Sequence, residues 1–494
     1  MKKESRFSLD KLMMLLSVLY IIAPIIIFFF GWLKTIYALI VTIPFLLFVY
    51  FVYKEFTKKE INLFKKENII YWIISIIVLG IWSYYSGIGA FSYQNSDHWV
   101  RNPIYRDLCN YKWPLIYDLS KEPSYVKNIT GTDTVAFSYY FTWWLVPALF
   151  SKIFGLSELG CNVVLQIWSV LGLLFVLYNI NRIIGKCSYY SLLVFVFFSG
   201  MDIIRALFYG KPYKFIEHIE WWTDLYWIQY SSNTTQLYWV FNQSIPLWII
   251  MSLLVQLNDN KFIGSLCALS FIYSPWAVFG IIPIAWVGSF FRKQSVKQAF
   301  NPINTIVTLE VAFVYGLFYM ASSGSSGGVS VTFSYYRAKL FGFIVDYLMF
   351  MIIEVVIYWL LVYKENKNDK YFWVITIELV IFPMVWMRDG NFTMRASIPA
   401  LFILMMYVIN TLIYTDNRRI KYLLSIALLI GSLTPISEIN RSVVNSRKGY
   451  IDNQEEIGSF GNIKTQDEAR INIVKDQFFI YGFEESLFFK YLGK

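Results

Sequence analysis

The sequence has few charged residues and almost no histidine. Only 15% of its 494 residues are charged, whereas 57% are hydrophobic and 20% aromatic; soluble domains carry about 25% charged residues. Two histidines, His98 and His218, are too few for a histidine-rich metal centre. The four cysteines are scattered without a CxxC pair, so neither a cysteine-ligated metal nor a disulfide framework is indicated. The composition excludes a soluble globular domain and predicts a polytopic membrane protein.

Familiar catalytic motifs are also missing from the positions where they would act. None of HExxH, GxSxG or a Walker sequence stands on a suitable predicted element, and ATP-driven chemistry is not indicated. The Gly- and Ser-rich run 322–330 follows no predicted strand and lacks a P-loop lysine, so we interpret it as a mobile flap. The net charge of +10 comes from Lys and Arg clusters between apolar runs. This pattern indicates membrane topology rather than nucleic-acid binding.

Apolar runs of about 20 residues, the length that crosses a bilayer, determine the predicted fold. The first three runs are expected at 12–32, 35–53 and 69–88. Basic connectors mark the cytoplasmic side and are found at 54–68, 292–297, 364–370 and 416–421. We expect an all-α protein with about thirteen transmembrane helices and a cytoplasmic N-terminus. The predicted outside loops are 89–136, 206–236, 322–340 and 387–397.

Two segments depart from simple spans. The run 262–291 is too long for one upright helix and is interrupted at Ser274-Pro275, which predicts two short helices. The segment 137–181 is expected to cross the membrane once, with its aromatic first half in the interface. We divide the chain into three parts. Residues 1–68 form an N-terminal hairpin with a cytoplasmic loop, residues 69–437 form a core of spans and outside loops, and residues 438–494 form a small C-terminal outside segment.

Polar residues predicted to face outside are the candidate functional groups. Asp97 directly follows a span, where a carboxylate suits a general base or a metal ligand; a solvated loop acid is the alternative. Asp202 ends a span, and Asn242 and Gln243 begin another, so these three are expected to be buried among helices. The further candidates are the acids Glu217, Glu220 and Asp224, and the arginines Arg337, Arg388 and Arg395. Arginines suit a phosphate, and snorkelling at the interface is their alternative role.

The order of these features resembles the GT-C membrane glycosyltransferases, which include protein O-mannosyltransferases, oligosaccharyltransferases and aminoarabinose transferases. The shared features are Asp97 just after a span, a second outside acidic site, many further spans and a C-terminal outside element. The resemblance covers the chain from about residue 69 onward. The stretches EHIEWWTDLYWIQYSSNTTQLYWVFNQSIPLW and RDGNFTMRASIPALF also look similar to those of bacterial membrane proteins of that superfamily.

This resemblance implies an inverting transferase in the bacterial plasma membrane, with its active site facing outside. Its donor would be a polyprenyl-phosphate-linked sugar, and its acceptor a cell-surface glycan, teichoic acid or lipid. Some members bind a divalent cation, which makes Mg²⁺ or Mn²⁺ the candidate cofactor, with Asp97 and Asp202 as candidate ligands. No nucleic-acid partner is expected.

The resemblance also implies roles for individual residues. Asp97 matches the first-loop catalytic acid, and Asp202 matches the second acidic motif, for which Glu217, Glu220 and Asp224 are the alternative. Arg395, together with Arg388 or Arg337, would bind the lipid phosphate. The residues expected to support the site are His98, Arg101, Asn242 and Gln243.

Two other classes of membrane protein compete with this interpretation. A polysaccharide polymerase or ligase of the O-antigen type is also polytopic, with a large outside loop and essential arginines, but its main loop is expected late in the chain. A transporter of a lipid-linked substrate predicts polar residues near the bilayer midplane and paired inverted repeats. Asp346, Glu354 and Glu378 lie within predicted spans and have no assigned role.

Overall fold

The computed structural model shows a protein built mainly of helices. It describes the chain except for residues 1–7, 59–60, 121–131, 209–215, 221–227, 258–259, 292–295, 323–328, 332–339, 388–390, 450–457, 462–473 and 475–476. In the part described, eight helices are long and apolar enough to cross a membrane, or nine if a bent pair counts as one span. The prediction of an all-α polytopic membrane protein is confirmed, but the count of about thirteen crossings is not.

The candidate spans are distributed along the whole chain. They are α1, Leu9–Trp32; α2, Thr35–Phe56; η1 and α3, Lys66–Tyr84; α7, Glu158–Ile184; α10, Asn233–Gln256; α13, Pro302–Met320; α14, η7 and α15, Phe341–Asn366; and α19 and α20, Arg418–Arg447. The bent pair, with an angle of 44°, is α8, Tyr189–Phe197, and α9, Asp202–Phe208. Shorter apolar helices are α11, Ile263–Tyr273; η4, Pro275–Ala277, with α12, Val278–Phe291; and α18, Ile398–Tyr414.

Several of these spans are composites, and short helices connect them. The components are η1, Lys66–Asn68; α3, Ile69–Tyr84; α14, Leu340–Met351; η7, Ile352–Val356; α15, Ile357–Asn366; α19, Arg418–Gly431; and α20, Leu433–Arg447. The other described helices are η2, Ile88–Ala90; α4, His98–Asn110; η3, Thr142–Trp144; α6, Leu145–Ile153; η5, Val296–Phe300; α16, Lys370–Ile381; η8, Phe382–Met384; α17, Asn391–Ala396; η9, Phe483–Glu485; and η10, Phe488–Leu492.

The two helices of the N-terminal hairpin differ in burial: α1 packs inside the helical bundle, whereas α2 is largely exposed. Asn179 of α7 donates through Nδ2 to Ser17 Oγ at 3.2 Å, and the Tyr273 hydroxyl of α11 donates to the carbonyl of Ile21. These bonds hold α1 inside the bundle. In contrast, only 28% of the most apolar stretch of α2 is buried. An exposed apolar helix of this length suits contact with lipid.

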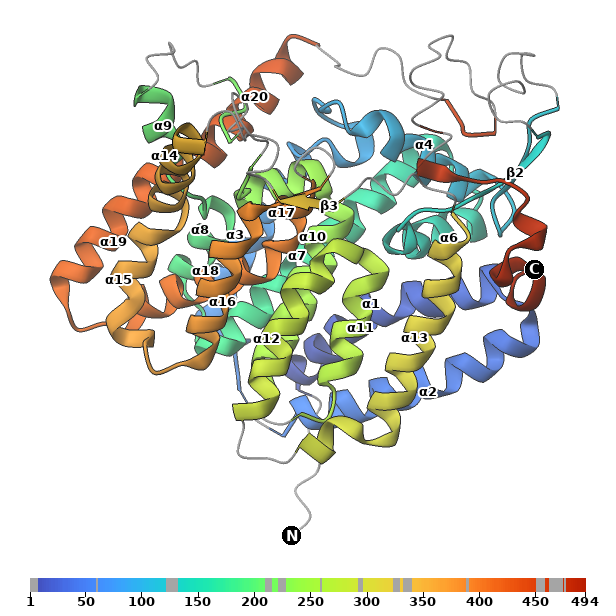
Figure 1. The fold of residues 1–494 in the computed structure, drawn as a ribbon, viewed down its shortest axis with the longest axis horizontal. Helices are drawn as coiled ribbons and strands as arrows, with labels where there is room; N and C mark the ends of the chain where they lie inside the picture. Colours follow the sequence, from blue (N-terminus) through green and yellow to red (C-terminus); the bar gives the residue numbers. More distant parts are fainter. Residues whose placement is uncertain are drawn as a thin grey trace.

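The expected break in 262–291 is confirmed. Helix α11 ends at Tyr273, and Ser274 has an extended backbone with φ −154° and ψ 95°. Pro275 then begins η4, which leads into α12. Because proline has no backbone N–H, it is tolerated at the start of the second helix but not within a continuous one. Figure 1 shows α11 and α12 side by side.

The segment 137–181 contains one candidate span, as expected. Its first part forms η3 and α6, which is only nine residues long. Its second part belongs to α7, a helix of 27 residues. Ser157 caps α7 by accepting from the Gly160 N–H, and Gly185 ends it with a φ of 88°, a left-handed conformation that favours glycine.

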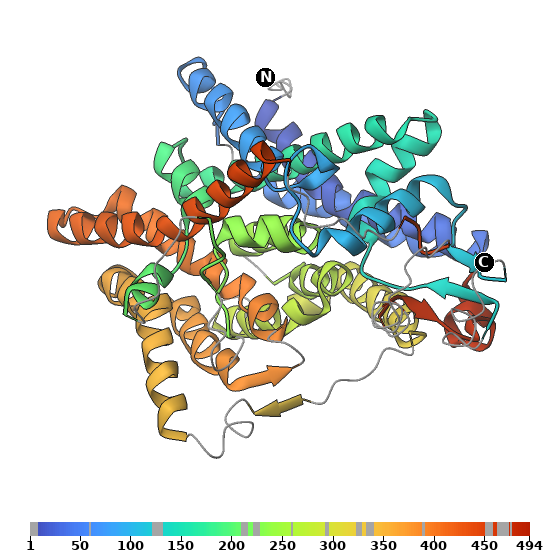
Figure 2. The ribbon, with the colours of Figure 1, turned by 90° about the horizontal axis from the view of Figure 1, so that it is seen from above.

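Helix α10 is the most enclosed span, with 89% of its apolar stretch buried. It packs against α1, α7, α11, α18 and α20, and Figure 2 shows it in light green in the middle of the other helices. The helix is kinked at Val240, which has φ −139° and ψ 38°. Pro246 lies four residues after Asn242 and has no N–H to donate to that carbonyl. The kink therefore falls in the half of α10 that carries most of its polar residues.

Short strands tie the C-terminal segment to the first long loop. One antiparallel sheet has the order β1–β2–β5, with β1 at Ile116–Asp118, β2 at Thr134–Phe137 and β5 at Phe479–Ile480. Asp107 of α4 accepts from the Tyr117 hydroxyl at 2.8 Å and from the Phe460 N–H at 2.9 Å. Burial raises the pKa of Asp107 to about 6. A second sheet pairs β3, Val329–Val331, with β4, Val385–Met387. The expected boundary at 438 falls inside α20.

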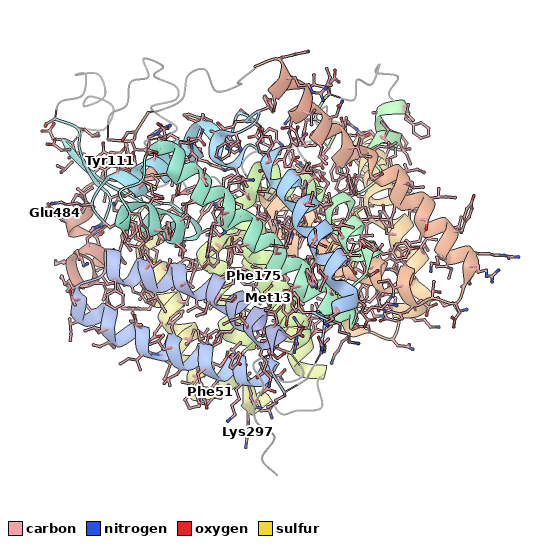
Figure 3. All side chains as sticks on the ribbon, turned by 180° about the vertical axis from the view of Figure 1, so that it is seen from behind. Met13, Phe51, Tyr111, Phe175, Lys297 and Glu484 are labelled. Atoms are coloured by element: carbon pink, nitrogen blue, oxygen red, sulfur yellow. The ribbon has the colours of Figure 1, made fainter. Side chains whose placement is uncertain are left out.

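The two ends of the bundle differ in character. The N-terminus and the α12–α13 connection lie at the lower end in Figure 1, whereas α4, α9, α20 and β2 lie at the upper end. Figure 3 shows Lys297 at the lower end and Tyr111 toward the upper end. We call the end with α4, α9 and α20 the upper end. Helix α4, part of the predicted outside loop 89–136, lies there, and Lys297 of the basic connector 292–297 lies at the other end.

The close packing of α7 against α1 and α10 gives a test of the fold. A Cβ at Gly172 would overlap the Tyr20 hydroxyl and a methyl group of Ile245, whereas a Cβ at Gly316 in α13 would have no heavy atom within 4 Å. We expect Gly172→Ala to lower the free energy of unfolding by about 1–3 kcal/mol. Gly316→Ala is the control and should be neutral or slightly stabilising, because alanine favours helix. Thermal unfolding of both variants in detergent would check this, and equal melting temperatures would contradict it.

Candidate functional site

Glu220 anchors the first turn of α10. Its Oε1 accepts from the Thr235 hydroxyl at 2.6 Å and from the Ser232 N–H at 3.0 Å, and its Oε2 accepts from Gln229 at 2.9 Å. A carboxylate is favourable here because the N–H groups of a first helical turn have no partners within the helix. Glu220 is buried, and burial raises its pKa to about 7 against the opposing charge of His218. Glu220 therefore has a clear role in capping the helix.

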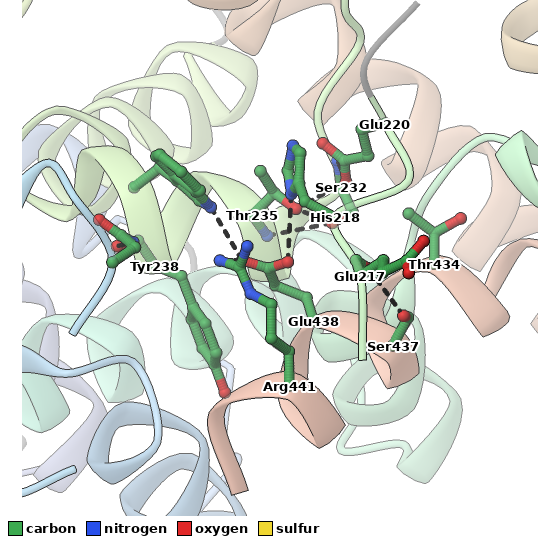
Figure 4. Close-up of polar contacts among 12 residues, drawn as sticks. Glu217, His218, Glu220, Ser232, Thr235, Tyr238, Thr434, Ser437, Glu438 and Arg441 are labelled. Atoms are coloured by element: carbon green, nitrogen blue, oxygen red, sulfur yellow. Dashed lines mark hydrogen bonds and ion pairs between the residues drawn. The ribbon is translucent and has the colours of Figure 1, made fainter. Parts of the chain in front are cut away.

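Glu438 of α20 is the centre of a second polar group, shown in Figure 4. Its carboxylate accepts from Arg441 Nη2 at 2.7 Å, from Trp239 Nε1 at 2.8 Å and from His218 Nδ1 at 3.1 Å. The Arg441 guanidinium also lies over the Trp239 ring, 5.5 Å from its centre. Because Glu438 is buried, these three donors replace the water that a carboxylate would otherwise need. The contacts join α20, α10 and residues 216–220.

The remaining predicted acids behave differently from one another. Asp202 is buried among helices, as expected, and its Oδ2 accepts from Thr434 at 3.0 Å and from Ser199 at 3.5 Å. Glu354 interacts with Asp202, and its carboxylate occupies the space that a Cβ at Gly200 would take. The Glu217 side chain is exposed, and the backbone carbonyl oxygen of Glu217 accepts from the Ser437 hydroxyl at 3.0 Å.

Asp97 lies at the start of a helix, α4, rather than in an extended loop. Its N–H donates to Asn95 Oδ1 at 3.0 Å, and Asn95 Nδ2 donates in turn to the carbonyl of Tyr238 in α10 at 2.9 Å. Its Oδ2 accepts from Arg101 Nη2 at 2.8 Å, one helical turn further on. The side chain of Asp97 is 40% exposed and that of Arg101 only 4%. Asp97 is therefore accessible, and a buried guanidinium orients its carboxylate.

Phe241 of α10 supports the buried residues of α4. The Arg101 guanidinium lies 5.4 Å from the centre of its ring, and the His98 ring stacks on it at 5.7 Å. Burial and the charge of Arg101 lower the pKa of His98 to about 3, so His98 is neutral at pH 7. Arg101 was expected to support the loop, but it contacts the candidate catalytic acid directly.

Arg395 approaches α10 from α17. Its Nε donates to Gln243 Oε1 at 3.1 Å, and the same oxygen accepts from Ser274 at 2.9 Å. Gln243 thus joins α17 and the break between α11 and η4 to the kinked helix. The neighbouring Asn242 donates to the carbonyl of Tyr140 at 3.5 Å. The expectation that Asn242 and Gln243 are buried among helices is confirmed.

The charges of Arg101 and Arg395 both act on Tyr139. Burial raises the pKa of this tyrosine, and both guanidiniums act against that rise. Asp97 is joined to the same place through Arg101. Asp202 interacts with Thr434, Ser199 and the charge of His218. We call Asp97, Arg101, Arg395 and Tyr139 the cationic cluster.

Some expected residues lie outside the described part of the chain. These are Asp224, Arg337, Arg388 and most of the run 322–330. Among the residues described, no group of three His, Cys, Asp or Glu side chains could hold a metal ion. Asp97 is paired with Arg101 and Asp202 accepts from Thr434, and the role of these two acids as ligands of a divalent cation stays a prediction.

Sequence reasoning missed several residues of these polar groups. Glu438 and Arg441 lie in a helix that looked like the start of a surface segment, although their i, i+3 spacing is typical of a helical ion pair. Arg101 is four residues after Asp97, the spacing of a neighbour on the same helix face. Reading 98–110 as a helix would have identified that pair.

Glu220 predicts a specific pH dependence. An acid with a raised pKa in the folded protein contributes stability below its unfolded pKa of about 4.3, and the contribution is lost as pH rises toward about 7. Wild type should therefore lose stability relative to Glu220→Gln between pH 4.5 and 7. Thermal unfolding of both proteins across pH 4–8 would check this. A difference in melting temperature that does not change with pH would contradict it.

Comparison with known proteins does not assign this arrangement to a family. No protein-family model, curated protein sequence or solved structure matches the chain. The function is therefore argued from the side chains around α10.

Proposed function

We propose that this membrane protein is a glycosyltransferase that moves a sugar from a polyprenyl-phosphate carrier to a cell-surface acceptor. The observation that carries the proposal is the cationic cluster. Two buried guanidiniums, Arg101 and Arg395, act on the same tyrosine, and an accessible carboxylate, Asp97, adjoins one of them. Phosphate is recognised by arginine through charge-assisted hydrogen bonds, and an acceptor hydroxyl requires a base.

The reaction follows from these two kinds of group. Asp97 accepts the proton of the acceptor hydroxyl as its oxygen bonds to the anomeric carbon of the sugar from the face opposite the phosphate. The bond between that carbon and the phosphate oxygen breaks, and the electron pair leaves with polyprenyl phosphate. Arg101 and Arg395 stabilise the negative charge that develops on this leaving group. Because phosphate leaves readily, the mechanism needs no strong general acid.

The position of the cluster supports the outer face of the membrane as the place of reaction. α4 lies at the upper end of the bundle in Figure 1, and the N-terminus and the α12–α13 connection lie at the lower end. Basic connectors face the cytoplasm in most membrane proteins. We therefore orient the upper end outward, in the plasma membrane of a bacterial cell.

A divalent cation has no assigned step in this mechanism. The resemblance implied Mg²⁺ or Mn²⁺ on Asp97 and Asp202, but Asp97 is paired with Arg101 and Asp202 interacts with Thr434. Charge on the leaving phosphate is balanced here by guanidinium groups.

A transporter of a lipid-linked substrate is the second candidate function. It is favoured by Glu354 and Glu378, two buried acids in the helical bundle. Glu354 lies in η7, a π-helical segment of the kind often found at functional sites. Both acids lie near the Tyr230 hydroxyl, whose pKa is raised by burial and further by Tyr347 and these acids. Acids inside a membrane often carry protons or ions in transport.

Replacing Asp97 separates the two functions. Asp97→Asn keeps the shape of the side chain but removes the base, so we expect transfer to fall about 10²–10⁴-fold. The measurement is transfer of labelled sugar from a polyprenyl-phosphate-linked donor by membranes that contain each protein. Glu484→Gln, at an exposed position near the C-terminus, is the control for charge removal.

Surface-glycan composition of cells with and without the gene would identify the sugar and acceptor for this assay. Full transfer by a folded Asp97→Asn protein would refute the glycosyltransferase assignment. Loss of carrier movement across the membrane in Glu378→Gln, with transfer absent from wild type, would support the transporter.

A further inference from the structure

A cavity lies beside the cationic cluster, between α4 and α7. Its volume is about 280 Å³, and η2, α4 and the first turns of α7 form its walls. Trp144 and Phe241 also line it. Arg101 belongs to both places, because it lines the cavity and pairs with Asp97. The space approaches the size of small-molecule sites, which begin at about 300 Å³.

Carboxamides dominate the polar part of the wall. Four of them line the cavity: Gln94, Asn102, Asn110 and Asn162. Gln94 and Asn102 are oriented by each other, with Asn102 Nδ2 donating to Gln94 Oε1 at 2.8 Å. Asn110 is exposed and Asn162 half-buried, so these two can meet an entering molecule. A carboxamide both donates and accepts hydrogen bonds, as a hydroxyl group does.

The charges of the wall are balanced within the protein. Arg101 pairs with Asp97 at 2.8 Å, and Arg106 pairs with Glu158 at 3.1 Å. Arg106 also donates to the carbonyl of Gly458 at 2.7 Å. His98, the remaining basic side chain of the wall, is neutral at pH 7. Because Arg106 is paired with Glu158 and His98 is neutral, the wall other than Arg101 carries no net charge, which favours a neutral ligand.

Buried donors of the wall lack acceptors. Nε and Nη1 of Arg101 have no hydrogen-bond partner among the described residues, and neither has Nε1 of Trp144. Both side chains are more than nine-tenths buried. An unsatisfied buried donor costs about 1–3 kcal/mol. These donors are shielded from the cavity, so the hydroxyl groups of a ligand would meet the carboxamides of the wall. Its apolar face would lie on Ala90 and Leu156, which line the cavity and are not buried.

We infer that the cavity between α4 and α7 binds a neutral saccharide unit, and that this unit is the end of the acceptor glycan. A sugar ring combines hydroxyl groups, ether oxygen and an apolar face, which are the features that the wall complements. The assignment to the acceptor rests on the proposed function. Arg101 lines this cavity and also belongs to the cationic cluster. The acceptor sugar and the donor phosphate would therefore be bound on opposite sides of the Arg101 side chain.

Binding tests this inference without any turnover. The purified full-length protein in lipid nanodiscs is titrated with glucose, galactose, N-acetylglucosamine and their disaccharides by calorimetry. We expect saturable binding of at least one of them. Asn162→Leu should weaken its Kd about tenfold, which corresponds to 1.4 kcal/mol. Glu484→Gln is the control and should bind as wild type does, and the melting temperatures should show that both variants are folded.

Three results would overturn the saccharide site. They are no binding of any neutral saccharide by wild type, equal binding by Asn162→Leu, and tighter binding of glucuronate than of the neutral sugars. In the transfer assay, Asn162→Leu should raise the acceptor KM with little change in kcat. Unchanged KM with normal transfer would refute the acceptor role and leave the glycosyltransferase assignment intact. If wild type binds a saccharide but transfers no sugar, the glycosyltransferase assignment is refuted and the saccharide-binding site is still supported.

Discussion

Polar groups carried into a membrane must find their partners inside the protein, because hydrocarbon offers none. Helix α10 brings more of them into the bundle than a span normally does, and their partners hold the upper end together. Glu220 accepts at its first turn, Glu438 accepts from Trp239, and Gln243 accepts from Arg395. Residues 216–220, α20 and α17 are thus positioned by one buried helix. The candidate site exists because these bonds must be made.

Two groups of charged side chains lie near the upper end. Asp202, Glu220 and Glu438 are associated with hydroxyl donors, His218 and Arg441. In the second group, Arg101 and Arg395 both act on Tyr139, with Asp97 beside Arg101. Two guanidiniums and one carboxylate suit an anion, such as the phosphate of the lipid carrier that we propose.

The residues found from the sequence and those missed differ in a regular way. Asp97, Asp202, Asn242 and Gln243 were recognisable because a polar residue at the edge of an apolar run is conspicuous. Glu438 and Arg441 were not, and Arg101 was identified only as a supporting residue, because each lies in a polar segment whose helical form depends on contacts with other elements. Arg101 is buried by Phe241, which is 140 positions later in the chain. Local pattern carries no information about such a distant partner.

Composition and hydropathy alone determined that this chain is a helical membrane protein, with a broken pair at Ser274-Pro275 and one crossing in 137–181. These properties are local, since apolar length and the missing proline N–H act within a single helix. Tertiary structure alone decided that one face of α4 is buried, that α20 joins the core, and that Arg101 of α4 and Arg395 of α17 both act on Tyr139. Those outcomes depend on which helices pack around α10, and packing brings together residues that no sequence spacing relates.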